Sequence, residues 1–155
     1  MTLTPRINIF QAAGEGTKAM IGVEAAIEKS GLEHSLLELV KIRASQINGC
    51  AFCIDMHVKD AVKRGESHQR IHLLDGWRDS PAFTDRERAA LNWTEVVTRI
   101  GKTHAPDADY ALLQAQFNES EIAWLTLAIG AINLWNRVQI ALKAVHPVEA
   151  SAAAA

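Results

Sequence analysis

The residues best suited to chemistry in this 155-residue chain are its only two cysteines, Cys50 and Cys53, in the stretch NGCAFCIDMH at 48–57. His57 follows Cys53 by four residues, so all three side chains would share one face of a helix. A thiolate is a nucleophile and a metal ligand, and an imidazole one turn away can accept its proton. Three interpretations follow: a redox pair, part of a metal site, or two small apolar residues of the core.

Redox chemistry is the interpretation that the spacing favours. Two cysteines three residues apart at a helix start can form a disulfide with little rearrangement, and the helix dipole there favours the reactive thiolate. Cys50 is nearer the helix start, so by this argument alone it would be the nucleophile. Cys50 and His57 lie two turns apart, and no second Cys/His pair completes a tetrahedral zinc site. We therefore predict neither a metal nor a cofactor.

Glu38 is a candidate general base for the thiols. It lies twelve residues before Cys50, on a helix predicted over Ser35–Ile47, and the short Asn48-Gly49 connection would make that helix a neighbour of the next. A carboxylate that reaches the thiol face from apolar surroundings can act in proton transfer near neutral pH. The alternative is an exposed glutamate paired with Lys41 or Arg43.

The elements that must position these residues are all predicted to be helices, six or seven in number. The four prolines fall between stretches of helical pattern, and no alternating strand pattern of any length occurs. Thr84 and Glu87 fit a capping box at one helix start. The other helices are expected at Thr17–Lys29, Ser35–Ile47, Cys50–Arg64, His68–Leu74, from Pro106 to about Phe117, and from a cap at Ser120 to about Val145.

The last of these helices is apolar nearly all round from Ile122 to Trp135. One small domain can hardly cover such a helix on every side, so we expect it to lie in the core and also in a subunit interface. The polar groups within Asn133–Arg137 are expected to be satisfied by neighbouring helices.

Composition limits the remaining possibilities. A net charge of -2 with mixed signs gives no basic field, so nucleic-acid binding is not supported. The N-terminal residues lack the pattern of a secretory signal, and the longest apolar run is shorter than the roughly 20 residues of a membrane span. We expect a cytoplasmic protein with one domain at 1–148 and a disordered tail at 149–155.

The stretch ELVKIRASQINGCAFCIDMH, with Glu38, Cys50, Cys53 and His57 at this spacing, resembles the alkylhydroperoxidase D-like (AhpD-like) family of the carboxymuconolactone decarboxylase superfamily. The segment NLWNR at Asn133–Arg137 is similar to one that many members carry on their last helix. The resemblance implies an all-α AhpD-like helical domain that assembles as symmetric homo-oligomers, often trimers or hexamers built from dimers.

The resemblance also implies a thiol-dependent peroxidase acting in antioxidant defence. Cys53 would attack the peroxide and become a sulfenic acid, and Cys50 would resolve it to a disulfide that an external dithiol or thiol protein reduces. Glu38 and His57 would form the proton relay. Characterised peroxidases of the family have a histidine just before the second cysteine, where this chain has Phe52. Since a phenyl ring cannot carry protons, the relay here would be shorter.

Two alternatives remain open from the sequence. The decarboxylases of the superfamily act on a lactone carboxylate without relying on a C-x-x-C pair, and His34 or His104 could in principle serve such a reaction. A non-catalytic redox sensor or binding module would use the thiols only to report oxidation.

Overall fold

The computed structural model describes residues 3–148, and within that range every regular element is a helix. The all-α prediction is confirmed, and the seven predicted helices correspond to the seven α-helices longer than one turn. The sequence did not indicate the single turns α1 and α7. The elements are α1 (Ile9–Ala12), α2 (Gly14–Ile27), α3 (His34–Asn48), α4 (Ala51–Lys63), α5 (His68–Leu73), the 3-10 helix η1 (Leu74–Asp79), α6 (Asp85–Thr98), α7 (Ile100–Thr103), α8 (Asp107–Gln114) and α9 (Glu119–Ala141).

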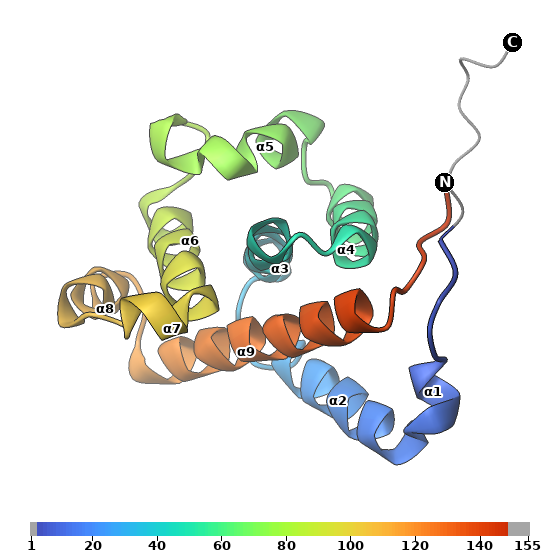
Figure 1. The fold of residues 1–155 in the computed structure, drawn as a ribbon. Helices are drawn as coiled ribbons and strands as arrows, with labels where there is room; N and C mark the ends of the chain where they lie inside the picture. Colours follow the sequence, from blue (N-terminus) through green and yellow to red (C-terminus); the bar gives the residue numbers. More distant parts are fainter. Residues whose placement is uncertain (1–2, 149–155) are drawn as a thin grey trace, which may run out of the picture.

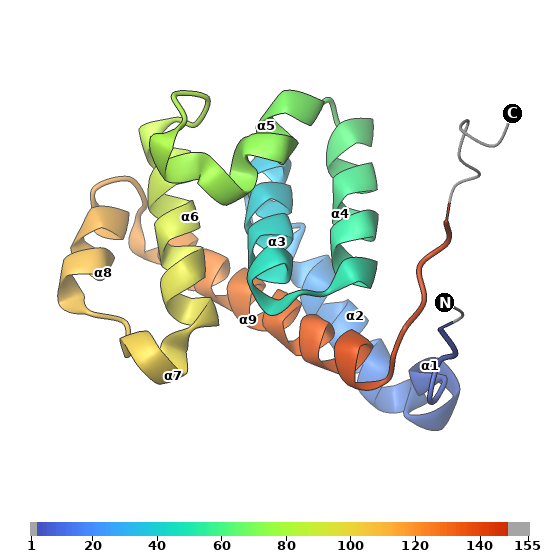
Figure 2. The ribbon, with the colours of Figure 1, turned by 45° about the horizontal axis from the view of Figure 1, so that its top comes forward.

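Helix α3 passes through the centre of the bundle (Figure 1). Helices α4 and α6 stand on either side of it, and α9 runs across it (Figures 1 and 2). The ten consecutive residues from Leu36 to Ser45 are all buried. A helix that is apolar on several faces is stable only when neighbours cover each face, which is why α3 forms the centre of the core.

A tight turn joins α3 to α4. Gly49 adopts a left-handed conformation with φ 72° and ψ 32°, which glycine reaches without the strain that a Cβ would introduce. The N–H of Cys50 then donates to the main-chain oxygen of Ser45 at 3.0 Å, and Cys50 becomes the N-cap of α4. Only Gly49 and Cys50 separate the two helices, so α3 and α4 are packed as direct neighbours.

The other helix ends test the predicted caps. The capping box of Thr84 and Glu87 is confirmed. The prediction that Ser120 caps the last helix is wrong, because Asn118 is the N-cap and forms a reciprocal capping box with Glu121. Ser120 already lies in the first turn. Helix α9 also ends at Ala141, before the predicted Val145, where the chain turns through a left-handed residue at 143.

Helix α9 is a core helix on one face, as predicted. Leu125, Ile129 and Ile132 are fully buried against the rest of the bundle. On the other face, the side chains of Leu127 and Leu134 remain 53% and 48% exposed. No helix within residues 3–148 is long and apolar enough to cross a membrane. The predicted tail at 149–155 lies outside the described residues.

Candidate active site

The N-terminus of α4 holds both cysteines in the core. Cys50 and Cys53 are each 1% exposed, and the structure joins them in a disulfide with Cα atoms 5.4 Å apart. The N–H of Cys53 also donates to the sulfur of Cys50, at 3.4 Å, so the first cysteine caps the helix with its side chain. Both cysteines pack against Ala44 and Ile132, with Phe52 and Trp135 at the margin of this cluster.

Glu38 and His57 meet between α3 and α4. Oε2 of Glu38 lies 2.9 Å from Nδ1 of His57, and the two residues are 3% and 7% exposed. With Nδ1 bonded to the carboxylate, Nε2 is the ring nitrogen left to exchange a proton with another group. His57 is one turn beyond Cys53 on the same face of α4. The structure thus pairs Cys50 with Cys53 and Glu38 with His57, and it places His57 one turn beyond Cys53.

The alternative of an exposed Glu38 paired with Lys41 or Arg43 is wrong. Lys41 is buried and pairs with Glu24 of α2 at 3.0 Å. Arg43 points to the opposite side of α3, where it pairs with Glu95 of α6 at 2.8 Å. Since both cations are engaged elsewhere, the charge of Glu38 is directed at the imidazole.

A pocket of about 290 Å³ opens onto this site. Cys53 and His57 both line it, whereas Cys50 does not. Cys53 is therefore the cysteine that a small molecule in the pocket would meet. The lining residues are mostly apolar and come from α1, α2, α4 and α9: Phe10, Ile21, Glu24, Phe52, Cys53, Met56, His57, Ile132, Trp135 and Gln139.

Part of the pocket wall could not be found by sequence reasoning. Phe10 belongs to the single-turn α1, whose position follows from Arg6. Arg6 donates from its main-chain N–H to Leu142 and from its side chain to Ala141, both at 2.9 Å. These bonds fix the N-terminal segment to the end of α9. No pattern in the first residues signals that contact, whereas Met56 could have been found because it follows Cys53 by three residues on the same helix.

Glu38 also lines a second, polar pocket of about 340 Å³ at the C-terminal end of α4, whereas the disulfide is at its N-terminal end. Asp60 lies exposed near the same pair. Carboxylate or ring-nitrogen atoms of Glu38, His57 and Asp60 all lie within 4.8 Å of one another. This is the arrangement within residues 3–148 that could hold a cation, and it does not include the cysteines.

The remaining histidines do not contribute to the site. His34, His68, His72 and His104 are exposed and His146 is half-buried, and none of the five lines the pocket at Cys53. His34 and His104, which the sequence left open for a decarboxylase reaction, thus lie on the surface and away from this pocket.

The polar residues of α9 behave as the helix-packing interpretation predicted. Asn133 donates to Thr98 and to a main-chain oxygen of its own helix, and Arg137 donates to Asn133. Asn136 is fully buried and donates to Ser45 of α3. Within the described part of the chain, no buried side-chain nitrogen or oxygen lacks a hydrogen-bond partner.

Fold and site together define an all-helical domain with a C-x-x-C pair at a helix start and a buried Glu–His pair beside it. The sequence profile of the Carboxymuconolactone decarboxylase family matches residues 13–96, which include all four of these residues. The chain belongs to the carboxymuconolactone decarboxylase family, and the AhpD-like resemblance is confirmed.

Three relatives illustrate the similarity. The chain is 40% identical over 140 residues to the uncharacterized protein YdfG of Bacillus subtilis (strain 168), which covers 90% of this chain and 95% of YdfG. A crystal structure of ATU0492 from Agrobacterium tumefaciens, a protein of unknown function described as a candidate antioxidant defence protein AhpD, matches with 49% identity and a TM-score of 0.92 over 94% of this chain and 100% of that one. A peroxidase-related protein from Silicibacter sp. TM1040 shares the fold at 24% identity, with a TM-score of 0.75 over 83% of this chain and 69% of that chain.

Proposed function

We propose that the protein is a thiol-dependent peroxidase of the alkyl hydroperoxide reductase type, acting in antioxidant defence. The observation that carries the proposal is the shared pocket: Cys53 and His57 line one apolar cavity, and His57 is held from behind by the buried carboxylate of Glu38. A nucleophile, a base within one helical turn and a group that orients the base are the three parts that covalent catalysis requires.

In the first step Nε2 of His57 accepts the thiol proton of Cys53. The thiolate attacks one oxygen of the hydroperoxide, so that an S–O bond forms while the O–O bond breaks. His57 returns the proton to the departing alkoxide, and the products are an alcohol and a sulfenic acid on Cys53. Glu38 keeps the imidazole in the orientation and tautomer that this transfer needs, and it stabilises the imidazolium between the two transfers.

In the second step the thiol of Cys50 attacks the sulfenic sulfur. The S–S bond forms, and the hydroxyl group leaves with the Cys50 proton as water. This step would form a disulfide between the same two cysteines that are joined in the structure. An external dithiol, or a protein carrying one, then supplies two electrons and two protons and restores both thiols.

The pocket favours an organic hydroperoxide with an apolar substituent. Phe52 and Trp135 give the pocket aromatic walls. At the position of Phe52, the family's characterised peroxidases carry the relay histidine. Burial of an apolar group contributes about 25 cal/mol per Å², which hydrogen peroxide cannot gain. Phe52 thus shortens the relay while adding apolar surface for the substrate.

The decarboxylase alternative is less well supported by the pocket. A lactone carboxylate needs a cation or several hydrogen-bond donors to replace its hydration. The lining residues within the described chain include no lysine or arginine, and they do include Glu24. The sensor alternative differs in chemistry, because a sensor would be oxidised once and would not cycle with a dithiol.

We further propose that the protein is a homo-oligomer, as in the trimers or hexamers of dimers that the family resemblance implies. The exposed face of α2 and α9, formed by Val23, Ala123, Leu127, Gly130 and Leu134 among others, supports this assembly because it is apolar and shallowly concave.

The test is turnover of an organic hydroperoxide by the reduced protein in the presence of a dithiol. With cumene hydroperoxide and dithiothreitol, we expect stoichiometric formation of the alcohol over many cycles. Cys53→Ser should abolish this activity. Reduced Cys50→Ser, freed of dithiothreitol before the hydroperoxide is added, should allow one turnover per chain. Unchanged turnover in Cys53→Ser would exclude the mechanism. Stoichiometric zinc in the purified protein would contradict a free redox pair.

A further inference from the structure

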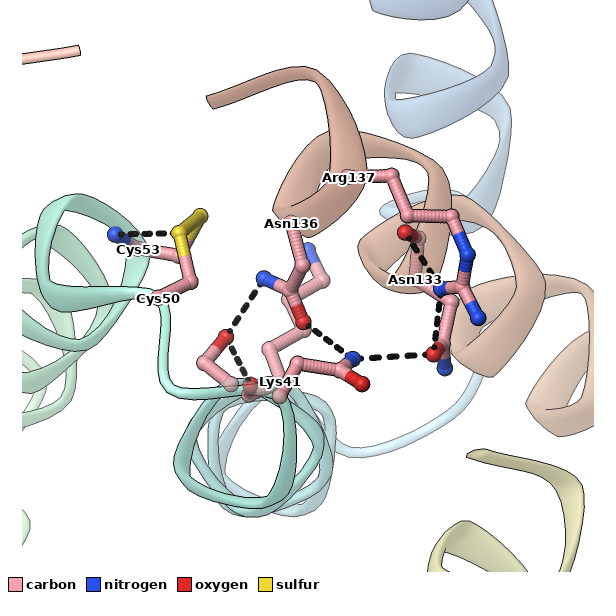
Figure 3. Close-up of a disulfide and its surroundings, with 8 residues drawn as sticks. Lys41, Cys50, Cys53, Asn133, Asn136 and Arg137 are labelled. Carbon is pink, nitrogen blue, oxygen red and sulfur yellow. Dashed lines mark hydrogen bonds between the residues drawn. A yellow bond between two sulfur atoms is a disulfide. The ribbon is translucent and has the colours of Figure 1, made fainter. Parts of the chain in front are cut away.

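The turn that carries Cys50 is tied to α9 by buried and half-buried polar side chains (Figure 3). Asn48, the last residue of α3, donates to Oδ1 of Asn133 at 2.9 Å and to Oδ1 of Asn136 at 2.8 Å. Asn136 in turn donates to the hydroxyl of Ser45 at 3.0 Å. We call Ser45, Asn48, Asn133 and Asn136 the amide cluster.

The amide cluster holds the residues that set the position of Cys50. Ser45 accepts the N–H of Cys50 with its main-chain oxygen and the amide of Asn136 with its hydroxyl. Asn48 is separated from Cys50 by Gly49 alone. Any displacement of the end of α3 would therefore move Cys50, and the amide cluster opposes that displacement from α9.

The burial of the cluster indicates a specific role in geometry. Ser45 and Asn136 are both 0% exposed. A buried amide without a hydrogen-bond partner lowers the stability of the fold. When every member of a buried polar network is hydrogen-bonded, the network fixes one arrangement of the side chains. Apolar side chains at these places would hold α3 against α9 equally well, but they would leave the two helices freer to slide.

We propose that the amide cluster positions Cys50 as the resolving thiol, acting through the end of α3 while the disulfide is open. In the disulfide state the S–S bond itself fixes the two sulfurs. In the dithiol and sulfenic acid states no covalent bond joins Cys50 to Cys53, and their separation then depends on the turn and on its anchor in α9. Holding two reacting groups in place raises their effective concentration, which favours both the rate and the equilibrium of ring closure.

Loss of the anchor has two measurable consequences. The first is a shift of the dithiol–disulfide equilibrium toward the dithiol. This equilibrium involves only the two thiols, so it can be measured whether or not the protein is a peroxidase. The second rests on the proposed function: a sulfenic acid that waits longer for Cys50 reacts with a second hydroperoxide. That step transfers one oxygen to Cys53, giving a sulfinic acid and another alcohol.

The variants Asn48→Ala and Asn136→Ala test the role, with Asn92→Ala as the matched control. Asn92 is also a buried asparagine with two side-chain partners, Arg78 and Asp109, but it lies on α6 and outside the amide cluster. Each folded protein is equilibrated with mixtures of reduced and oxidised dithiothreitol. We expect about a tenfold shift toward the dithiol in the cluster variants, equivalent to about 30 mV for a two-electron couple, and none in Asn92→Ala.

Mass spectrometry of Cys53 after turnover provides the second measurement. We expect a several-fold larger sulfinic acid fraction in Asn48→Ala and Asn136→Ala than in the wild type or in Asn92→Ala. If Asn136→Ala does not fold, Asn48→Ala decides, because its side chain is only half-buried.

Two outcomes have opposite meanings. Cluster variants that lose thermal stability as Asn92→Ala does, yet keep the wild-type equilibrium and sulfinic fraction, would overturn the positioning role. A shifted equilibrium in a protein that consumes no hydroperoxide would support the positioning role and reject the peroxidase proposal.

Discussion

Glu38 and His57 are held 2.9 Å apart, nearly out of contact with water, by two helices that a two-residue connection makes neighbours. Because Nδ1 of His57 is taken by the carboxylate, the imidazole has one nitrogen left for chemistry. His57 and Cys53 line the same cavity. In the proposed mechanism this pair directs proton transfer to and from the thiol of Cys53.

Replacing Glu38 by glutamine tests the relay. Glu38→Gln keeps the size of the side chain and a hydrogen-bonding oxygen but removes the charge that stabilises the imidazolium. We expect the rate of Cys53 oxidation to fall about 10²-fold, the lower end of the usual effect of general acid–base groups. Stopped-flow measurement of thiol oxidation across pH reports the rate, with the surface variant Glu33→Gln as control. Rate constants that are unchanged at every pH would remove Glu38 from the relay.

Phe52 offers the opposite test, a gain of function. Phe52→His places an imidazole beside Cys53 at the edge of the same cavity. We expect peroxide reduction to accelerate by about tenfold, since the new group supplements a relay that already contains His57. Phe52→Leu is the control, because it keeps an apolar wall and adds no proton donor. Equal rates in the histidine and leucine variants would mean that proton delivery does not limit the reaction.

An acid-stability prediction concerns the other side of α3. Burial acts to raise the pKa of Glu95. The hydrogen bonds from Trp77, Arg43 and Arg78, together with the charge of Arg43, outweigh burial and hold the pKa below the ordinary 4.5. Because the folded-state pKa is lowered, this stabilisation is complete above the ordinary pKa and is lost as the pH falls toward the folded-state value.

Glu95→Gln should therefore lower the free energy of unfolding at neutral pH by about 2 kcal/mol, the usual value of hydrogen bonds to a charged group. It should also make stability fall less steeply below pH of about 4.5. Urea denaturation of both proteins at several pH values measures this. Parallel curves for variant and wild type would show that Glu95 does not contribute to the acid dependence.

The proposed assembly is tested by a charge on the exposed face of α9. Leu127 is 53% exposed there, and Leu127→Glu should dissociate the oligomer because a carboxylate is costly to bury without a partner. Leu112→Glu, at a leucine of α8 that is 57% exposed and away from this face, is the matched control. Light scattering coupled to gel filtration gives the mass of each. A wild-type mass equal to one chain would rule out assembly.

The site was predictable from the sequence because its geometry is local. Cys50, Cys53 and His57 share a face through helical periodicity alone, and the Asn48-Gly49 signal placed Glu38 on a neighbouring helix. The same locality made the capping box at Thr84 visible. Asn118 and Ser120 are both good cap residues, but only Asn118 has a glutamate three residues later, Glu121, as a capping box requires. That spacing identifies Asn118 as the N-cap.

Other features depend on contacts that no local pattern encodes. Asn48 and Asn136 are 88 residues apart in the chain, and the sequence shows only that both are polar. Phe10 reaches the pocket because Arg6 binds the far end of α9. For the two cysteines, the helix dipole alone favoured Cys50 and the family resemblance implied Cys53. The cavity, which Cys53 lines and Cys50 does not, agrees with the resemblance.

The most direct test of the account is the identity of the cysteine that takes the peroxide oxygen. Reduced Cys50→Ser, treated with one equivalent of cumene hydroperoxide and a sulfenic acid trap, should carry the trapped adduct on Cys53, in proportion to the alcohol released. Cys53→Ser should form no adduct on Cys50 over the same time. An adduct that forms on Cys50 at a comparable rate, or alcohol released without any adduct, would contradict the proposed mechanism.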